Sequence, residues 1–165
     1  KTTIISTLKK RGYTCFPEIS REIILEAQKT RNINQLFLSH PDEFNEKLLT
    51  GRIQQFNDAK HVDANIVFLD RGLPDVLAYM DYAKSVYPSY FVEACESNKY
   101  DKVFVLSPWQ EIFVSDSERY ENFNQAVEIH HALLDTYANF DYELLDVPFG
   151  TVAHRADFIL DALNL

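Results

Sequence analysis

Glycine is scarce in this sequence, with 4 residues among 165. A loop that wraps a phosphate group with its backbone needs several glycines close together, because the chain must bend sharply and approach the ligand. The interior of the chain therefore contains no complete loop of this kind. Cysteine is scarce as well: Cys15 and Cys95 both lie in apolar runs and lack the spacing of a metal site. We expect two free, buried thiols in a reducing compartment.

Basic residues are also few, since 16 Lys and Arg stand against 25 Asp and Glu and the formal net charge is −9. A nucleic-acid-binding surface needs clustered Lys and Arg, so we expect no nucleic-acid binding. No apolar run approaches the length that crosses a membrane, and no signal peptide is recognisable. We therefore expect no membrane association and a cytoplasmic location. The length predicts a single domain over residues 1–165 with a substantial core, and leaves the oligomeric state open.

Four short apolar segments, each followed by a helical pattern, make up most of the chain. The middle two are almost continuously hydrophobic, which is typical of strands buried on both faces of a parallel sheet. This alternation predicts an α/β fold, a three-layer α/β/α sandwich around a parallel sheet. The predicted strands cover residues 13–16, 66–69, 103–106 and 142–145. The predicted helices cover residues 2–11, 20–30, 41–60, 73–85, 88–97, 120–138 and 151–163, with prolines at residues 41, 74 and 88 near three helix starts.

The first three residues, Lys1-Thr2-Thr3, precede an amphipathic run that stops at Gly12. They match the end of the pattern G-x-x-x-x-G-K-[ST], in which backbone N–H groups surround phosphates, the Lys reaches them and the hydroxyl binds Mg²⁺. An ordinary first helical turn with a threonine cap is the alternative. Such a loop follows a strand, and in this fold that strand runs through the middle of the sheet. We therefore expect an intact domain to carry about ten more residues ahead of Lys1, a strand followed by Gly-x-x-x-x-Gly.

Two pairs of a carboxylate and an arginine follow predicted strands. Asp70 and Arg71 end one buried strand, where a carboxylate can hold Mg²⁺ and an arginine can bind a phosphate or a substrate carboxylate. Glu18 and Arg21 follow the first strand, and Glu18 could act as a general base or orient an attacking hydroxyl. Helix capping is the alternative role for both carboxylates. We predict one sheet with Glu18, Asp70 and Ser107 at the same edge.

Two further loops are candidates for ligand contacts. Residues 109–122 contain an apolar segment and then a polar one with Arg119, as in lids that close over phosphoryl groups. A charged helix start capped by Asp116 is the alternative. Pro148-Phe149-Gly150 follows the last strand at the ligand edge and could flank a purine, or could form a turn with Thr151 as the helix cap.

Taken in order, these pieces resemble the bacterial "predicted ATPase" branch of the P-loop kinases, an AAA-labelled domain related to nicotinamide riboside kinase domains. The resemblance spans nearly the entire chain. It rests on Lys1-Thr2-Thr3, Arg11-Gly12-Tyr13, Pro17-Glu18, Asp70-Arg71-Gly72-Leu73-Pro74-Asp75, Ala78-Tyr79, Tyr100-Asp101-Lys102-Val103-Phe104, Pro108-Trp109, Asp116-Ser117-Glu118-Arg119-Tyr120 and Val147-Pro148.

The resemblance implies a five-stranded parallel sheet, ATP and Mg²⁺ as cofactors, and an unidentified small-molecule substrate as partner. Under it Lys1 is the Walker lysine, Thr2 and Asp70 bind Mg²⁺, and Arg119 is a lid arginine. It further implies catalytic roles for Glu18, Asp70, Arg71 and Arg119, nucleotide contacts from Lys1, Thr2, Thr3, Pro148 and Gly150, and substrate contacts from Arg21, Asp75, Tyr79 and Trp109.

Two functions fit these observations. The first is a small-molecule kinase that transfers the γ-phosphate of ATP to a hydroxyl. The second is a nucleotide-dependent switch or slow NTPase that acts through a protein partner. Two carboxylate-arginine pairs at one sheet edge are more than hydrolysis needs, and they favour the kinase. The sequence does not distinguish ATP from GTP and does not name the acceptor.

Overall fold

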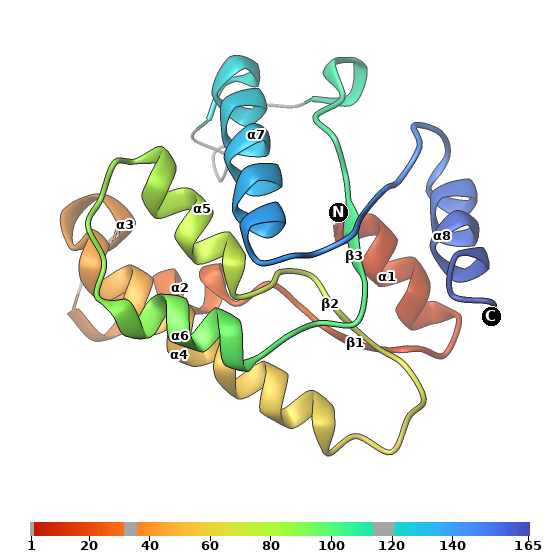
Figure 1. Cartoon of the computed structure of the whole chain (residues 1–165), viewed down its shortest axis with the longest axis horizontal. Coiled ribbons are helices and arrows are strands. Elements are labelled where there is room, and N and C mark those ends of the chain that lie inside the picture. The colour runs from red at the N-terminus through yellow and green to blue at the C-terminus, as the bar shows by residue number, and fades with distance from the viewer. Residues whose placement is uncertain (1, 32–35, 114–120) are drawn as a thin grey trace.

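The computed structural model describes residues 2–31, 36–113 and 121–165. Strands and helices alternate along this part of the chain nearly as the sequence predicts (Figure 1). A short helix, α3, and a 3₁₀ turn, η1, were not predicted. The elements are α1 (Thr2–Lys10), β1 (Thr14–Phe16), α2 (Ser20–Arg31), α3 (Leu36–Ser39), α4 (Pro41–Lys60), β2 (Val67–Leu69), α5 (Pro74–Tyr82), α6 (Ser89–Ser97), β3 (Val103–Val105), η1 (Gln110–Ile112), α7 (Phe123–Asn139), β4 (Leu144–Asp146) and α8 (Val152–Asp161).

Local sequence signals explain where several helices begin. Pro41 and Pro74 occupy the first turns of α4 and α5, where the missing N–H of proline costs nothing, and Pro88 precedes α6. Helix α7 begins at Phe123 rather than near residue 120, because Asn122 and Gln125 form a capping box. In it each side chain accepts a 2.9 Å hydrogen bond from the backbone N–H of the other residue.

The strands form two parallel pairs. Strand β1 pairs with β2, with Cys15 opposite Phe68, and β3 pairs with β4, with Phe104 opposite Leu145. The predicted parallel direction is confirmed within each pair. Among the described residues no backbone ladder joins β2 to β3, and this gap lies where the sequence analysis expected a further strand in the middle of the sheet. The two strands instead face each other across a cleft, so the mixed α/β fold holds but the three-layer sandwich is incomplete.

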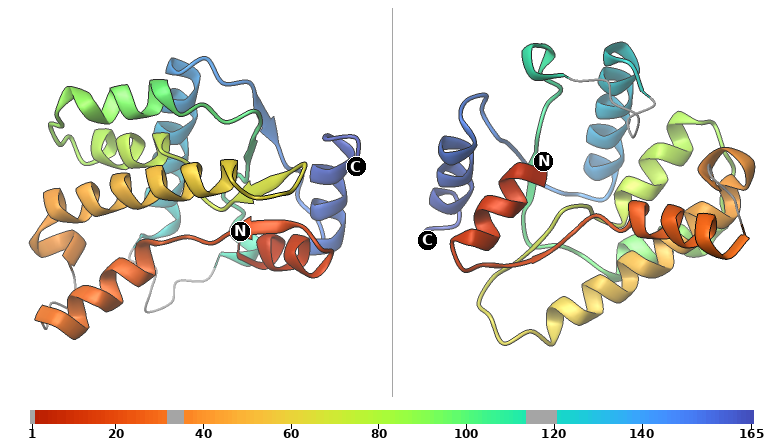
Figure 2. Two further views of the ribbon diagram at one scale, coloured as in Figure 1. Left: turned by 90° about the horizontal axis from the view of Figure 1, so that it is seen from below. Right: turned by 180° about the vertical axis from the view of Figure 1, so that it is seen from behind.

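Helices cover the strands from two sides, and each side has its own apolar cluster. Helices α1 and α8 pack together on one side, while α4, α5 and α6 gather on the other (Figures 1 and 2). The first cluster joins α1, α8, β2 and the start of the β4–α8 loop through Ile4, Leu8, Phe68, Val147, Ala156, Ile159 and Leu160. The second joins α4, α5 and α6 through Leu48, Leu49, Leu73, Val76, Leu77, Met80, Phe91 and Cys95.

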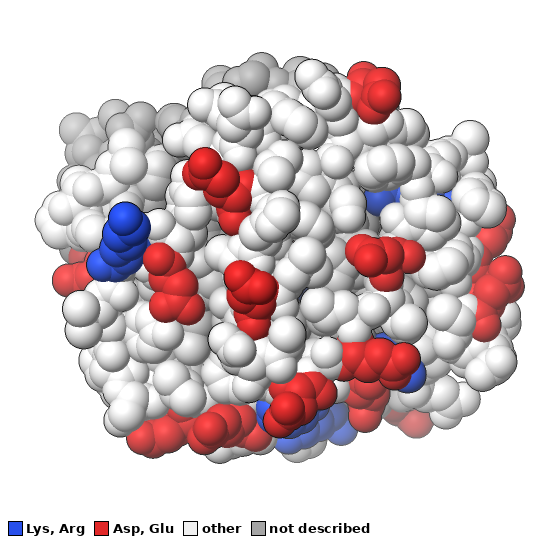
Figure 3. All heavy atoms as spheres, turned by 45° about the horizontal axis from the view of Figure 1, so that its top comes forward, with Lys and Arg blue, Asp and Glu red and all other residues white. Residues whose placement is uncertain are grey.

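The surface and the thiols agree with parts of the sequence analysis. Acidic side chains are spread over the face shown in Figure 3, and basic ones are few there. Both cysteines are free, Cys95 is fully buried, and Cys15 is half-buried. Burial raises the pKa of the Cys95 thiol to about 12, so it remains protonated and unreactive at neutral pH. Among the described residues, no helix combines the length and the apolar character that a membrane crossing requires.

Candidate active site

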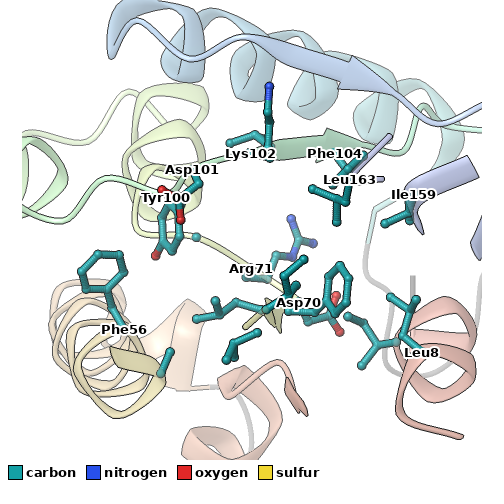
Figure 4. Close-up of a pocket in the computed structure, with 18 of the residues that line it drawn as sticks. Leu8, Phe56, Asp70, Arg71, Tyr100, Asp101, Lys102, Phe104, Ile159 and Leu163 are labelled. Atoms are coloured by element: carbon teal, nitrogen blue, oxygen red, sulfur yellow. The ribbon is translucent and has the colours of Figure 1, made fainter. Parts of the chain in front are cut away.

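A cleft of about 790 Å³ lies between β2 and β3. Residues along the whole length of both strands line it, and helices α1, α4, α7 and α8 form its walls. Figure 4 shows Asp70 and Arg71, which directly follow β2, side by side, with Tyr100 on one flank and Leu8 with Ile159 on the other. The cleft is therefore mainly apolar along the strands, and it becomes polar where β2 ends.

Glu18 follows β1 and is bound by two arginines, and one of them, Arg71, lines the polar end of the cleft. Arg71 Nε is 3.1 Å from Glu18 Oε2, and Arg52 Nη2 on α4 is 3.2 Å from Oε1 and 3.3 Å from Oε2. The backbone N–H of Ser20 also donates to Oε1 at 3.1 Å. The carboxylate thus accepts a hydrogen bond at the start of α2, as the capping interpretation predicted, and also pairs with Arg71 just after β2, a contact that the sequence analysis did not predict.

Asp75 continues this network on the other side of Arg71. Its Oδ1 is 2.6 Å from Arg71 Nη1, and its Oδ2 accepts hydrogen bonds from Tyr137 Oη at 2.6 Å and Gly72 N at 3.0 Å. Tyr79 Oη lies 3.5 Å from Arg71 Nη2, at the limit of a hydrogen bond. The side chains of Glu18, Arg52, Arg71 and Asp75 are 22%, 5%, 19% and 7% exposed. Two carboxylates and two arginines are therefore paired with little solvent around them.

The electrostatics of the cluster keep Glu18 and Arg71 charged. Burial by itself raises the pKa of Glu18, but Arg52, Arg71 and the Ser20 amide outweigh it, so this pKa is lowered. Burial acts to lower the pKa of Arg71, and Asp75, Tyr79 and Glu18 hold it well above its usual value. Burial and the neighbouring Asp75 carboxylate raise the pKa of Tyr137, which therefore stays a hydrogen-bond donor.

The turn from β2 into α5 is held rigidly by its neighbours. Arg52 Nη1 donates to the carbonyl of Gly72 at 3.0 Å, and the backbone N–H of Leu73 donates to Tyr100 Oη at 3.0 Å. A Cβ at Gly72 would meet Tyr137 Oη and lie 3.0 Å from the ring of Tyr100. Glycine is required here because the two tyrosines approach the backbone closely.

The loops after β3 and β4 meet through aromatic rings. Trp109 stacks on Phe149 with ring centroids 4.9 Å apart and planes at 22°. Phe149 lies between the predicted nucleotide residues Pro148 and Gly150, and half of its surface is exposed. Thr151 Oγ1 accepts a hydrogen bond from the N–H of His154 at 3.2 Å, so Thr151 caps α8 as one sequence interpretation predicted.

The remaining predicted residues are placed as follows. Thr2 and Thr3 are exposed in the first turn of α1, and Ile4 and Ile5 behind them line the same cleft as Asp70 and Arg71. Arg21 is exposed in the first turn of α2, and Ser107, at the end of β3, lies with its Oγ 3.4 Å from His130 Nε2. Lys1 and most of the predicted lid, including Asp116 and Arg119, lie outside the described residues.

Sequence reasoning missed Arg52 and Tyr137. A signal for Arg52 exists: it lies in helical phase with Leu48, Leu49 and Phe56 on the buried face of α4. A charged residue on an apolar helical face usually has a specific partner, since an unpaired buried charge is costly. Tyr137 gives no comparable signal, because a tyrosine on the buried face of a helix fits an ordinary core.

In this cluster Arg71 can bind an anion and Glu18 can accept a proton, and the neighbouring Asp70 presents a carboxylate to a cation. Arg71 reaches the cleft with a forked guanidinium, which suits phosphate or carboxylate oxygens. The described residues contain no group of three or more His, Cys, Asp or Glu side chains that could hold a metal ion alone. Mg²⁺ commonly needs only one or two protein carboxylates when phosphates and waters complete its shell, so Asp70 fits a shared Mg²⁺.

One of the comparisons with known proteins shows the family of the chain. Neither the curated proteins nor the solved structures include a match to the chain. Residues 1–155, however, match the family described as AAA domain. The match covers almost the entire sequence, including the α1 start, the β2 end and the loop after β4. The chain therefore belongs to the AAA domain family, a P-loop NTPase-type family of nucleotide-binding proteins.

Proposed function

We propose that this protein is an ATP-dependent phosphotransferase that moves the γ-phosphoryl group of ATP to a hydroxyl of a small molecule. One observation carries the proposal: Glu18, Asp70 and Arg71 meet at the carboxyl ends of β1 and β2. Ligands of open α/β sheets bind at this edge. A carboxylate base and a neighbouring arginine serve an acceptor hydroxyl, whereas a simple NTPase has less need of them.

The residues divide into an acceptor end and a nucleotide end. At the acceptor end Glu18 takes the hydroxyl proton, Arg71 with Asp75 and Tyr79 orients the acceptor, and Arg21 flanks the entrance. At the nucleotide end we assign phosphate contacts to Lys1, Thr2 and Thr3, purine contacts to Pro148 and Gly150, and neutralisation of charge on the leaving group to Arg119. Trp109 stacks on Phe149, which favours a place beside the nucleotide rather than the acceptor.

Mg²⁺ would be held by Asp70 and Thr2 together with the phosphates of ATP. Bound there, it neutralises negative charge on the β- and γ-phosphate oxygens. The chain itself supplies the carboxylate of the half-buried Asp70. The backbone N–H of Asp70 donates to the carbonyl of Phe16 at 3.0 Å and so fixes the residue just after β2.

The cleft between β2 and β3 fits a fifth parallel strand. Among the described residues β2 pairs only with β1 and β3 pairs only with β4, and residues of β2 and β3 line the cleft. Unpaired backbone groups in a buried place cost about 1–3 kcal/mol each, so an apolar strand in the cleft would stabilise both halves of the sheet. A strand that leads into Lys1 through Gly-x-x-x-x-Gly would also complete the phosphate-binding loop.

Hydrogen exchange tests the fifth strand. An extended chain, with about five apolar residues and Gly-x-x-x-x-Gly ahead of Lys1, is compared with the 165-residue chain. We expect slower exchange at the amides of Val67–Leu69 and Val103–Val105 in the extended chain. The matched control carries a proline in the middle of the added strand, which removes a ladder donor. Equal protection in all three proteins would contradict the proposal.

A thermal-shift screen tests the activity itself. The extended chain is heated with ATP or GTP and Mg²⁺, alone and with candidate hydroxyl compounds. A kinase should gain further stability from a second, small-molecule ligand, because each ligand that binds only the folded state raises the melting temperature. Stabilisation by nucleotide alone, followed by slow hydrolysis without any acceptor, would favour the switch or NTPase instead.

A further inference from the structure

The two arginines that bind Glu18 differ in access to ligand. Arg71 lines the cleft and is 19% exposed. Arg52 is 5% exposed, and the described residues that line the cleft do not include it. Arg52 also donates a hydrogen bond from Nη1 to the carbonyl of Gly72, so both terminal nitrogens of its guanidinium are held. A ligand at the carboxyl end of β2 can therefore reach Arg71, whereas Arg52 is almost fully buried.

Arg71 can move away from Glu18 and Asp75 without leaving either carboxylate unpaired. Glu18 would keep the hydrogen bonds from Arg52 and the Ser20 amide. Asp75 would keep those from Tyr137 and the Gly72 amide. Breaking a buried ion pair is costly mainly because it leaves an unpaired charge, and here each carboxylate retains donors. The hydrogen bond from Arg71 to Tyr79 is long, so it adds little to the stability of this position of Arg71.

We propose that Arg71 is an exchangeable partner of Glu18, and that it binds an anionic group, a phosphate or a carboxylate, on the acceptor substrate. This inference rests on the proposed phosphoryl transfer and names the class of its acceptor: a molecule with both a hydroxyl and an anionic group. When Arg71 turns to the anion, Oε2 of Glu18 is free to accept the hydroxyl proton. Arg52 is then a positioning residue that keeps the carboxylate in place.

This exchange couples acceptor binding to the strength of the base. During transfer a bond forms between the acceptor oxygen and the γ-phosphorus, the bond to the ADP oxygen breaks, and the proton passes to Glu18. The groups that face Glu18 are Arg52, Arg71 and the Ser20 amide, which lower its pKa, and Asp75, which raises it. Withdrawal of Arg71 removes one of these cations, so the carboxylate becomes a stronger base only with the acceptor present.

The test uses the 165-residue chain with ¹³C-labelled glutamate and inorganic phosphate as the probe. The Glu18 carboxyl signal, assigned by its loss in Glu18→Gln, is titrated by NMR with and without phosphate. We expect phosphate to move the titration midpoint to higher pH. In Arg71→Gln the midpoint should already be higher and should not respond to phosphate. Calorimetry should show phosphate binding about tenfold weaker in this variant, the size of one charge-assisted contact.

Further arms identify the anion and control for folding. Acetate at neutral pH replaces phosphate, and binding of either anion through Arg71 supports the exchange and names the chemistry. Arg71→Lys keeps the positive charge but loses the forked guanidinium. This variant decides the outcome if Arg71→Gln does not fold. The Arg71→Lys protein should bind phosphate more weakly than the native chain. Arg11→Gln is the matched control, since Arg11 pairs with Asp157 at 2.6 Å on the surface, and phosphate binding should be unchanged.

Three results would overturn the exchange: no binding of either anion to the native chain, equal phosphate binding when Arg71 is replaced, or a midpoint that phosphate does not move. The outcome is separable from the proposed function. If Glu18→Gln abolishes phosphoryl transfer in the extended chain while the midpoint stays fixed, only the exchange is wrong. If the midpoint moves but no acceptor is phosphorylated, the transferase proposal fails.

Discussion

The Glu18 side chain has two competing roles, one structural and one as the proposed base. It satisfies the Ser20 amide at the start of α2, and it accepts hydrogen bonds from Arg52 and Arg71. A carboxylate with this many donors is an effective structural anchor and a weak base until one donor leaves. A substitution at this position must therefore be measured for both stability and rate.

Glu18→Gln tests its catalytic role. The amide keeps the size of the side chain but cannot take up the hydroxyl proton, so turnover in the extended chain should fall by roughly 10²–10⁴-fold, with nucleotide affinity nearly unchanged. Steady-state rates and nucleotide titration are the measurements. Full turnover with a lowered melting temperature would make Glu18 structural and leave Asp70 as the remaining candidate base.

The same variant gives a pH signature. The pKa of Glu18 in the folded state is lowered from its usual value of 4.5. The ionised carboxylate therefore contributes stability that is fully present above about pH 4.5 and is lost as the pH falls through the folded value. Urea unfolding across this range should show a smaller acid-induced loss of stability in Glu18→Gln than in the native chain. Parallel pH profiles for the two proteins would show that this ion pair contributes nothing to stability.

Among the elements, the turn between β2 and α5 depends on α4 and α7. Arg52 from α4 and Tyr137 from α7 both bind this turn, and Gly72 is the point where they converge. The sequence predicted the turn and its Asp70-Arg71 pair, since apolar strand residues run straight into charged ones. It could not predict the partners from α4 and α7, because contacts over 20 to 62 residues of separation depend on how helices pack.

Gly72→Ala should destabilise the protein. The new methyl group would meet Tyr137 Oη and the ring of Tyr100, both of which are fixed by hydrogen bonds. Such overpacking costs about 1–3 kcal/mol, which urea unfolding measures. Gly51→Ala in helix α4 is the matched control, because a Cβ at Gly51 meets only the flexible end of the Ile19 side chain. Equal stability of the two variants would show that the β2–α5 turn can shift freely.

Tyr137→Phe measures the contribution to stability of the hydrogen bond from Tyr137 on α7 to Asp75 on α5. The change leaves the ring and removes the hydroxyl donor of Asp75, which should lower the free energy of unfolding by about 1–3 kcal/mol. Tyr87→Phe provides the comparison, since Tyr87 donates to Asp81 at 3.0 Å in an exposed place where water replaces the lost bond. A similar loss of unfolding free energy in both variants would show that burial of the hydrogen bond between Tyr137 and Asp75 adds nothing to its contribution to stability.

For the whole molecule, the order of strands and helices followed from periodicity and from helix-start signals such as Pro41 and Pro74. The parallel direction within each strand pair also followed, because a helix separates each strand from the next. The gap between β2 and β3 lies where the sequence analysis expected a further, middle strand, but apolar runs alone do not reveal it. Such runs show that Phe68 and Phe104 belong to buried strands, but they do not show which edges are paired.

The stack of Trp109 on Phe149 also has a practical consequence for experiments. Trp109 is the only tryptophan in the chain, so any tryptophan emission comes from this one contact between the loops after β3 and β4. The protein thus contains its own optical reporter beside the proposed purine site. Addition of nucleotide to the extended chain should change that emission, and Phe149→Leu should change the signal by removing the stacked ring. A stopped-flow trace could then time ligand arrival at this loop pair without any attached dye.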